Sequence, residues 1–377
     1  MSLTAQAESG YSIKSIMKFA GAFLAWLIGS GFATGQEMLQ FFSAYGCRSY
    51  AVLLVNLIGF TLLAQVMLLT GFDHRDDSSF NHFKHFSGDR VGAFYTWLIP
   101  ISLVLIMSVL VSGAGATMAE YYGINHHVGS ASMALLVLTA YLVGFERLVK
   151  VVSKIGPLVI LFSLVIGTIT VVRDAGKFSE ISEHTIILNE LRAAPHWSIS
   201  SVLYISLNFL SGGGYFVALG GTAINRKDAK YGALLGALIF VLAVAVINSA
   251  ILLNADHTVS AAIPMLFLAR RISYVLGAVF SLVLILGMFS SCSAMMWSVC
   301  SRFKAGGSRG NRLFAVLVAL IIFVLGLFSF DELIGFFYPL EGYIGLVFVG
   351  GAAVKGVRQF LRDRKRRASE FVEDDGV

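Results

Sequence analysis

Two glutamates lie inside long apolar segments, where a carboxyl group is costly and its default interpretation is functional. Glu37 follows the run LIGSGFATGQ in the first apolar segment, and Glu341 lies nine residues beyond Glu332 in the last one. At a rise of 1.5 Å per residue, Glu341 is about 14 Å into its helix, near the middle of a bilayer. A carboxyl group withdrawn from water favours its protonated form, so either residue could take up and release a proton. The alternative for both is a hydrogen bond that fixes an interrupted helix.

Two clusters of glycine and serine lie at the centres of the first and sixth apolar segments. The first contains Gly29, Ser30, Gly31 and Gly35, and the second is the run SGGG at 211–214. An unpaired backbone amide in hydrocarbon costs several kcal/mol, so irregular backbone persists only where protein or a water-filled cavity supplies partners. One such cluster alone is typical of close helix packing. Two clusters at corresponding positions of two halves predict two broken helices around a site at the membrane midplane.

A broken helix exposes backbone groups that can bind charged ligands. The amides at the start of a half-helix suit a carboxylate, and the carbonyls at its end suit an ammonium group or Na⁺. A small zwitterion satisfies both, so the glycines predict a site for such a ligand.

The composition places these segments in a membrane. Of 377 residues, 57% are hydrophobic and 13% are charged, with a mean hydropathy of +0.79, whereas soluble domains carry about 25% charged residues. The pattern predicts an all-α membrane protein with ten transmembrane helices, and no polar block is long enough for a separate domain. The expected spans are Ile13–Tyr45, Ser49–Gly71, Val91–Tyr121, Val128–Gly144, Leu148–Val172, Ile199–Ile224, Ala229–Leu253, Ile263–Cys300, Leu313–Phe330 and Glu332–Val354.

The distribution of basic residues predicts the orientation. With ten spans, 22 of the 28 Lys and Arg residues fall on the side that holds both termini, which the positive-inside rule places in the cytoplasm. The compact chain suits a bacterial inner membrane. The expected division is 1–173 for a first five-helix repeat, 198–354 for a second and 355–377 for a basic tail. The net charge of +6 comes mainly from loops and this tail, which predicts contact with anionic lipid rather than with nucleic acid.

Other functional classes lack their motifs. Cys47, Cys292 and Cys300 lie in or beside apolar segments and are odd in number, which favours small apolar side chains over a disulfide framework or metal cluster. The sequence contains no HExxH, GxSxG or phosphate loop. We therefore expect neither an enzyme nor a cofactor, and no metal other than sodium.

Three motifs carry a family resemblance. IGSGF in the first segment, the stretch GFERLVKVVSKIGPLVILFSLVIGTITVVRD with Lys154, Ile155 and Pro157, and FDEL at Phe330 to Leu333 resemble the LeuT-fold transporters. These form the amino acid-polyamine-cation superfamily, which includes the neurotransmitter:sodium symporters. The longer stretch IGSGFATGQE resembles the YkvI-like bacterial membrane proteins. The resemblance implies a 5+5 inverted repeat of ten helices in which helices 1 and 6 are broken.

The same resemblance implies a set of substrate-binding residues. It places a substrate carboxylate against the amides of Ser30 and Gly31, and an amino group against carbonyls near Leu27 and helix 6. Met107 falls where the sodium symporters carry a tyrosine, and Tyr215 or Phe209 could form an aromatic lid. The implied set is Leu27, Ile28, Ser30, Gly31, Met107, Phe209, Ser211, Gly212, Gly213, Gly214 and Tyr215.

The sequence leaves two candidates for the coupling ion, sodium and a proton. The family's second sodium site implies the carbonyls of Ala25 and Ile28 with hydroxyls of Ser290 and Ser291, although the best register needs a shift of one residue to use both serines. Glu37 and Glu341 are the competing candidates and favour a proton.

The expected function is a secondary active transporter that works by alternating access on a small amino acid or related zwitterion, coupled to a cation. Two alternatives are a proton-coupled transporter of another small amine or carboxylate, and a ligand sensor on the same fold. The expected partners are a small-molecule substrate and membrane lipids.

Overall fold

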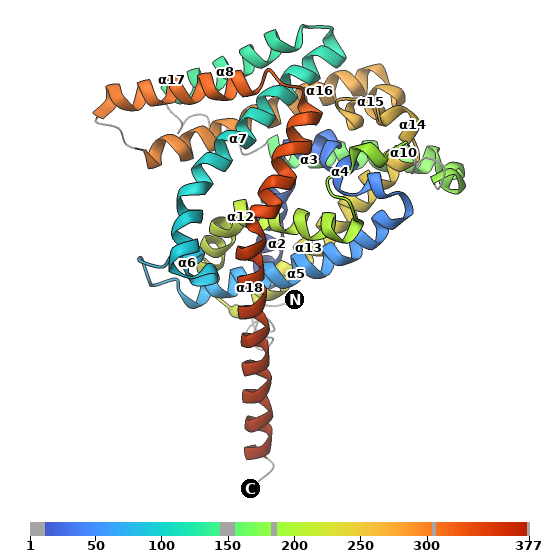
Figure 1. The fold of residues 1–377 in the computed structure, drawn as a ribbon. Coiled ribbons are helices and arrows are strands. Elements are labelled where there is room, and N and C mark those ends of the chain that lie inside the picture. The colour runs from blue at the N-terminus through green and yellow to red at the C-terminus, as the bar shows by residue number, and fades with distance from the viewer. Residues whose placement is uncertain (1–11, 144–154, 182–186, 304–306, 375–377) are drawn as a thin grey trace.

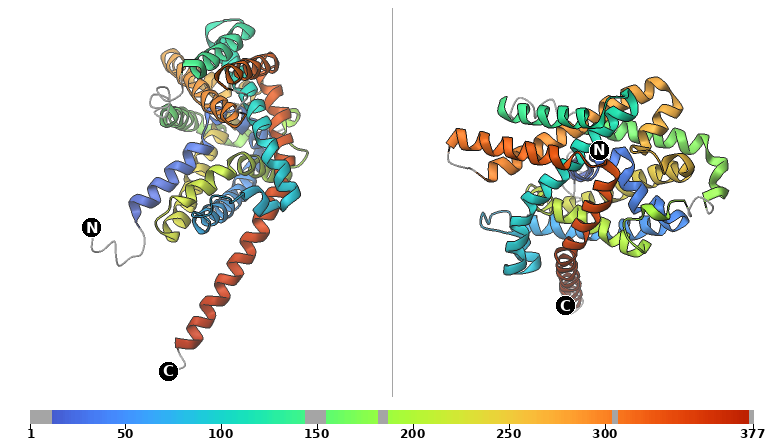
Figure 2. Two further views of the ribbon diagram at one scale, coloured as in Figure 1. Left: turned by 90° about the vertical axis from the view of Figure 1, so that its left-hand side faces the viewer. Right: turned by 45° about the horizontal axis from the view of Figure 1, so that its top comes forward.

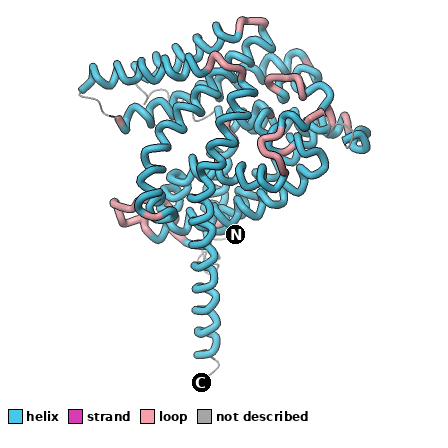
Figure 3. The backbone as a smooth tube through the Cα atoms, viewed as in Figure 1, coloured by secondary structure: helices cyan, strands magenta, loops and turns pink. Residues whose placement is uncertain are grey.

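The described part of the chain is helical. The computed structural model describes residues 12–143, 155–181, 187–303 and 307–374, and these contain helices but no strand (Figures 1 and 3). The first half comprises α2 (Ile13–Leu27), α3 (Ser30–Thr34), α4 (Gln36–Phe41), η1 (Ser43–Arg48), α5 (Ser49–Asp73), α6 (His82–Ser87), α7 (Asp89–Tyr122), α8 (His126–Val143) and α10 (Ile155–Arg173). The second half comprises η2 (Ala175–Glu180), η3 (Asn189–Leu191), α12 (Trp197–Gly221), α13 (Arg226–Leu252), α14 (Ala255–Thr258), α15 (Pro264–Ile272), α16 (Tyr274–Arg302), α17 (Gly307–Leu325) and α18 (Phe330–Asp374).

Eight helices of the described residues are long and apolar enough to cross a membrane. They confirm an integral membrane protein, while the count of ten spans and the 5+5 repeat stay predictions. The first predicted span is divided among α2, α3 and α4, so it contributes no continuous helix of that length. α17 is the other predicted span outside the eight. Part of the fifth predicted span, and its Lys154, lie outside the described residues.

The predicted break in helix 6 is wrong for this structure. α12 is continuous from Trp197 to Gly221 and passes through the whole SGGG run. The Ser211 hydroxyl donates to the carbonyl of Leu207 at 2.9 Å, one turn earlier, so its polar group stays within the helix. The three glycines instead allow close packing, because Cβ atoms on them would meet Trp26, Phe348 and His82 in turn. The packing explanation for glycine clusters therefore holds for this helix.

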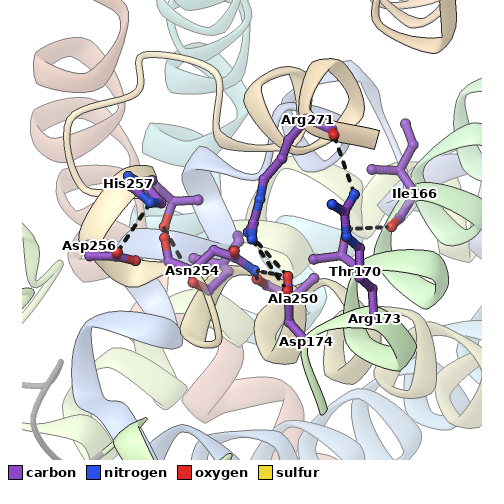
Figure 4. Close-up of polar contacts among 11 residues, drawn as sticks. Ile166, Thr170, Arg173, Asp174, Ala250, Asn254, Asp256, His257 and Arg271 are labelled. Atoms are coloured by element: carbon purple, nitrogen blue, oxygen red, sulfur yellow. Dashed lines mark hydrogen bonds and ion pairs between the residues drawn. The ribbon is translucent and has the colours of Figure 1, made fainter. Parts of the chain in front are cut away.

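The predicted span Ile263–Cys300 is two helices. α15 ends at Ile272, and Ser273 has an extended backbone (φ −160°, ψ 139°) before α16 begins. Figure 4 shows the reason: Arg271, in the last turn of α15, donates to both carboxylate oxygens of Asp174 at 3.1 and 3.3 Å. The Asn254 amide also donates to Asp174 at 3.0 Å. This partly buried ion pair ties the end of α15 to the residues that follow α10 and α13.

The helices form two apolar cores. One core joins α2, α5, α12 and α13 with parts of α10, α15 and α18. The other joins the second half of α7 with α8, α16 and α17. α2 begins and α18 ends on the same side of the bundle, and α18 continues beyond it through the basic tail as a single helix (Figures 1 and 2). We call this side the terminus side.

Candidate functional site

The first break in helix 1 lies between α2 and α3. Ile28 (φ −92°, ψ 79°) and Gly29 (φ −92°, ψ −175°) leave the helical region. In the described backbone, helical pairing ends with the Ile28 amide on the Leu24 carbonyl and resumes with the Ala33 amide on the Gly29 carbonyl. The carbonyls of residues 25–28 and the amides of Gly29, Gly31 and Phe32 therefore lack helical partners, as expected for backbone that can bind a ligand.

A second break follows at Gly35, between α3 and α4. Gly35 has a φ of 83°, in the left-handed region where glycine is favoured. The Thr34 hydroxyl donates to the Gly31 carbonyl at 2.6 Å and accepts from the Gln36 amide at 3.3 Å. One side chain thus satisfies backbone groups on both sides of the turn, which stabilises the interruption.

A cavity of about 550 Å³ lies against the first break. Its walls come from α2, α3, α4, α7, α12, α16 and α18, so widely separated parts of the chain enclose it. Its volume is typical of small-molecule sites. We call it the central cavity.

Glu37 is the one charged side chain among the described residues that line the central cavity. It is 9% exposed, and its Oε2 accepts a long hydrogen bond of 3.5 Å from the Tyr204 hydroxyl. A Cβ atom on Gly31 would clash with Oε1 of Glu37 and would lie 3.3 Å from the Tyr338 hydroxyl. The carboxyl group therefore sits directly over the broken backbone, and the missing side chain of Gly31 makes room for it.

Glu341 lies one turn after Tyr338 on α18 and is 7% exposed. Ser102 of α7 lies beside its carboxyl group, and Oε1 is buried without a hydrogen-bond partner among the described residues. Tyr338, rather than Glu341, reaches the cavity wall. Glu341 is thus a buried carboxyl group next to the central cavity and not part of its lining.

An aromatic pair forms one wall. The rings of Trp26 and Tyr215 stack with centroids 5.0 Å apart and an interplanar angle of 18°. The Tyr215 hydroxyl donates to the Ala22 carbonyl at 3.0 Å. This bond joins α12 to α2 and holds the two rings beside the cavity.

A second cavity of about 730 Å³ is lined by residues of α7, α8, α14, α15 and the start of α18, which is the end of α18 away from the C-terminus (Figure 1). Its lining includes Ala116 on α7 and Phe330 on α18. Between the cavities, the Phe330 ring packs so closely on Gly113 that a Cβ there would lie 2.7 Å from it. Gly113 is one turn from Ala116 of this cavity and one turn from Leu110 of the central cavity. The contact between Phe330 and Gly113 therefore lies between the two turns of α7 that line the two cavities.

Comparison with known proteins gives relatives along nearly the whole chain. It is 25% identical over 361 residues to a Bacillus subtilis protein described as "uncharacterized membrane protein YkvI", covering 90% of this chain and 96% of that one. It is 23% identical over 333 residues to YyaD of the same organism, covering 88% and 94%. The resemblance to the YkvI-like membrane proteins is confirmed. No family model matches.

A solved structure shares the fold of this chain. A manganese transporter of Eremococcus coleocola, solved as a mutant, aligns with a TM-score of 0.52 at 14% identity, covering 90% of this chain and 76% of that one. At this identity the alignment shows a shared fold and nothing about the ligand.

Eight of the sixteen predicted site residues line the central cavity. The predicted residues that line it are Ala25, Leu27, Gly31, Glu37, Ser211, Tyr215, Ser290 and Ser291. Ser290 and Ser291 on α16 face the same space as Ala25, as a sodium site would require. Ile28 is buried at the break but is not part of the lining, and the side chain of Ser30 lies outside the described set.

Other predicted residues pack elsewhere. Met107 is fully buried in the second apolar core, and the Cys292 thiol donates to its carbonyl at 3.8 Å. Phe209 packs between Phe60 and Phe216. Gly212, Gly213 and Gly214 contact the aromatic residues described above rather than the cavity. Because α12 does not unwind, its glycines expose no backbone toward the ligand space.

Several lining residues were missed. Asn208 shares a face of α12 with Ser211 and Tyr215, and the spacing of three and four residues was a usable signal. Trp26 and Tyr338 carried no such signal, because each looks like an ordinary aromatic residue of a membrane helix. Their roles depend on how α2 and α18 are rotated in the bundle.

Proposed function

We propose that the protein is a secondary active transporter for a small amino acid or related zwitterion, coupled to a cation. The observation that supports this most is the pair of cavities lined by successive turns of α7, with the contact of Phe330 on Gly113 between those turns. Alternating access requires a central site that connects to one side at a time, and a thin layer on a moving helix can open and close such a path. The fold shared with a transporter supports the same proposal.

The lining favours an organic solute over a divalent metal. Manganese and similar ions prefer several oxygen ligands, commonly carboxylates. The lining supplies one carboxyl group, and no set of three His, Cys, Asp or Glu residues among the described ones could hold a metal ion. The stacked Trp26 and Tyr215 rings instead suit a ligand with an apolar body.

Either coupling ion has candidates around this cavity. Ala25, Ser290 and Ser291 would serve sodium, with the unpaired carbonyls at the helix 1 break completing its ligands. Glu341, buried beside Tyr338, would serve a proton, in the runner-up transport of another amine or carboxylate. In the proposed orientation both termini face the cytoplasm of a bacterial inner membrane, and the basic end of α18 contacts anionic lipid headgroups.

A ligand screen followed by uptake tests the proposal. The purified protein is heated with each proteinogenic amino acid and with simple amines, in Na⁺ or choline at two pH values, since a ligand of the native state raises stability. The compounds that stabilise it are then offered to proteoliposomes under a sodium or proton gradient. Accumulation of a compound inside the proteoliposomes supports transport, and the gradient on which it depends identifies the coupling ion. Binding without accumulation under either gradient would contradict transport and favour a sensor.

A further inference from the structure

The charge inventory of the central cavity bears on the chemical class of its ligand. Among the described residues that line it there is one carboxyl group, that of Glu37, and there is no Lys, Arg or His. The four ion pairs between described residues all lie elsewhere. A buried carboxylate without a positive partner is unstable, so an ionised Glu37 requires a cation from outside the protein.

The hydrogen bonds of Glu37 leave room for that partner. A carboxylate can accept about four hydrogen bonds. Within the described structure its hydrogen bond is the one from Tyr204, and at 3.5 Å it is longer than the usual 2.5–3.0 Å. Most of the acceptor capacity of this carboxyl group is therefore unused, although the residue is only 9% exposed and lines a cavity.

The position of Glu37 also disfavours an anionic ligand group at the helix 1 break. Oε1 lies so close to Gly31 that a Cβ there would clash with it. A ligand carboxylate placed against the Gly31 amide, as the family resemblance implies, would touch the Glu37 carboxylate. Two like charges at contact in a poorly solvated cavity repel strongly. An ammonium group at the same place would be attracted.

The surrounding rings suit the same cation. Trp26 and Tyr215 present a stacked aromatic wall, and the Tyr338 hydroxyl lies near the same Cβ position of Gly31 as the Glu37 carboxyl group. Aromatic faces attract organic ammonium groups and pack against the carbon chain that carries them. A metal cation would find one carboxylate and an otherwise largely apolar lining.

We propose that the central cavity recognises a primary amine through Glu37, and that a carboxylate on the ligand is dispensable. The inference rests on the proposed function, because it takes the central cavity as the transport site. It changes the group that defines the substrate from a zwitterion to a primary ammonium group on a small apolar body. Glu37 then binds the ligand, which leaves Glu341 as the carboxyl group available for proton coupling.

Matched sets of three compounds test this. Each set holds an amino acid, its decarboxylated amine and its deaminated acid, for the alanine, valine, leucine and phenylalanine skeletons. Binding to the full-length purified protein is measured by calorimetry at pH 7. We expect at least one amine to bind within tenfold of its amino acid or more tightly, and no acid to bind. A panel in which every amine fails to bind or binds more than tenfold more weakly than its amino acid would overturn the proposal, and so would any acid that binds.

Two variants locate the interaction. Glu37→Gln keeps the shape of the side chain but removes its charge, so amine affinity should fall by about 100-fold, as for a buried charge that loses its partner. Glu332→Gln makes the same chemical change on the exposed surface of α18 and should leave binding unaltered. Unchanged amine affinity in Glu37→Gln would contradict the proposal, and the wild-type panel decides the ligand class even if this variant fails to fold.

Uptake separates this inference from the transport proposal. Amino acid accumulation in proteoliposomes without amine binding would refute recognition through Glu37 and leave transport standing. Amine binding that depends on Glu37, without accumulation of any compound, would refute transport and leave the recognition intact.

Discussion

The two glycine clusters look alike in sequence and differ in structure. GSG and Gly35 interrupt helix 1 twice, whereas SGGG lies in the middle of an unbroken α12. The difference is in what surrounds them. Helix 1 has Thr34 to satisfy freed backbone groups and a left-handed Gly35 to redirect the chain. In α12, Ser211 bonds back within its own helix and three aromatic side chains press on the glycines.

Glycine therefore permits a break in a membrane helix but does not cause one. A break persists where other groups or a cavity can supply partners for the freed backbone, and helix 1 has Thr34 at its second break and the central cavity at its first. The same residue type serves ligand access in one helix and close packing in the other. Substitutions at the two clusters should accordingly fail for different reasons.

Gly31→Leu should have the largest effect on function. Its side chain would displace the Glu37 carboxyl group and fill the space beside Tyr338, so we expect uptake and ligand-induced stabilisation to fall by more than about 100-fold while membrane insertion persists. Gly21→Leu is the matched control in α2, because nothing lies within 4 Å of that position. Wild-type uptake by Gly31→Leu would contradict the central site.

Gly35→Ala should have the largest effect on stability. A non-glycine residue in the left-handed region costs about 1–3 kcal/mol, and the new Cβ would lie 2.8 Å from Cγ of Met265. Gly123→Ala is the matched control, because Gly123 is also in the left-handed region (φ 68°, ψ 14°) and nothing lies within 4 Å of its Cβ position, so it should show the backbone cost alone. Unfolding in detergent measures both, and equal losses would show that crowding by Met265 contributes nothing.

Gly214→Ala in α12 should have little effect on stability or uptake, in contrast to the substitutions in helix 1. Alanine favours a helix interior by up to about 1 kcal/mol over glycine, and its Cβ would lie 3.1 Å from Cε1 of the His82 ring. We expect an unchanged or slightly higher melting temperature together with normal uptake. A stable variant that has lost most of its uptake would instead show that α12 must unwind during transport.

The sequence predicted those features that depend on local pattern. Hydropathy located the membrane helices, and glycine spacing located the helix 1 break, because both reflect the cost of polar groups in hydrocarbon. The continuity of α12 and the separation of α15 from α16 were missed. They depend on tertiary contacts, such as those of Trp26 with Gly212 and of Arg271 with Asp174. Pro264 and the pair Arg270 and Arg271 were the local signals for a separate α15.

The smallest predicted effect is a pH dependence of the free energy of unfolding that comes from His82, which lies in α6 and packs on α12. Burial lowers the pKa of His82 to about 4, below the 6.5 of an exposed histidine, and the pKa of nearby His85 is lowered to about 4 by burial, Lys355 and His74. The unfolded chain therefore binds protons below pH 6.5 that the folded protein does not bind. These two histidines should therefore leave the free energy of unfolding at its full value above pH 6.5 and lower it as the pH falls from 6.5 toward 4.

His82→Gln removes one of these two groups while keeping a polar side chain of similar length against Gly214. Between pH 7 and pH 5, the loss of unfolding free energy should shrink by about 1 kcal/mol, after allowance for the partial exposure of His82. The remaining slope belongs to His85. If the variant and the wild type lose stability equally over this range, His82 does not stay neutral in the folded protein, and its ring does not pack against α12 as closely as the glycines allow.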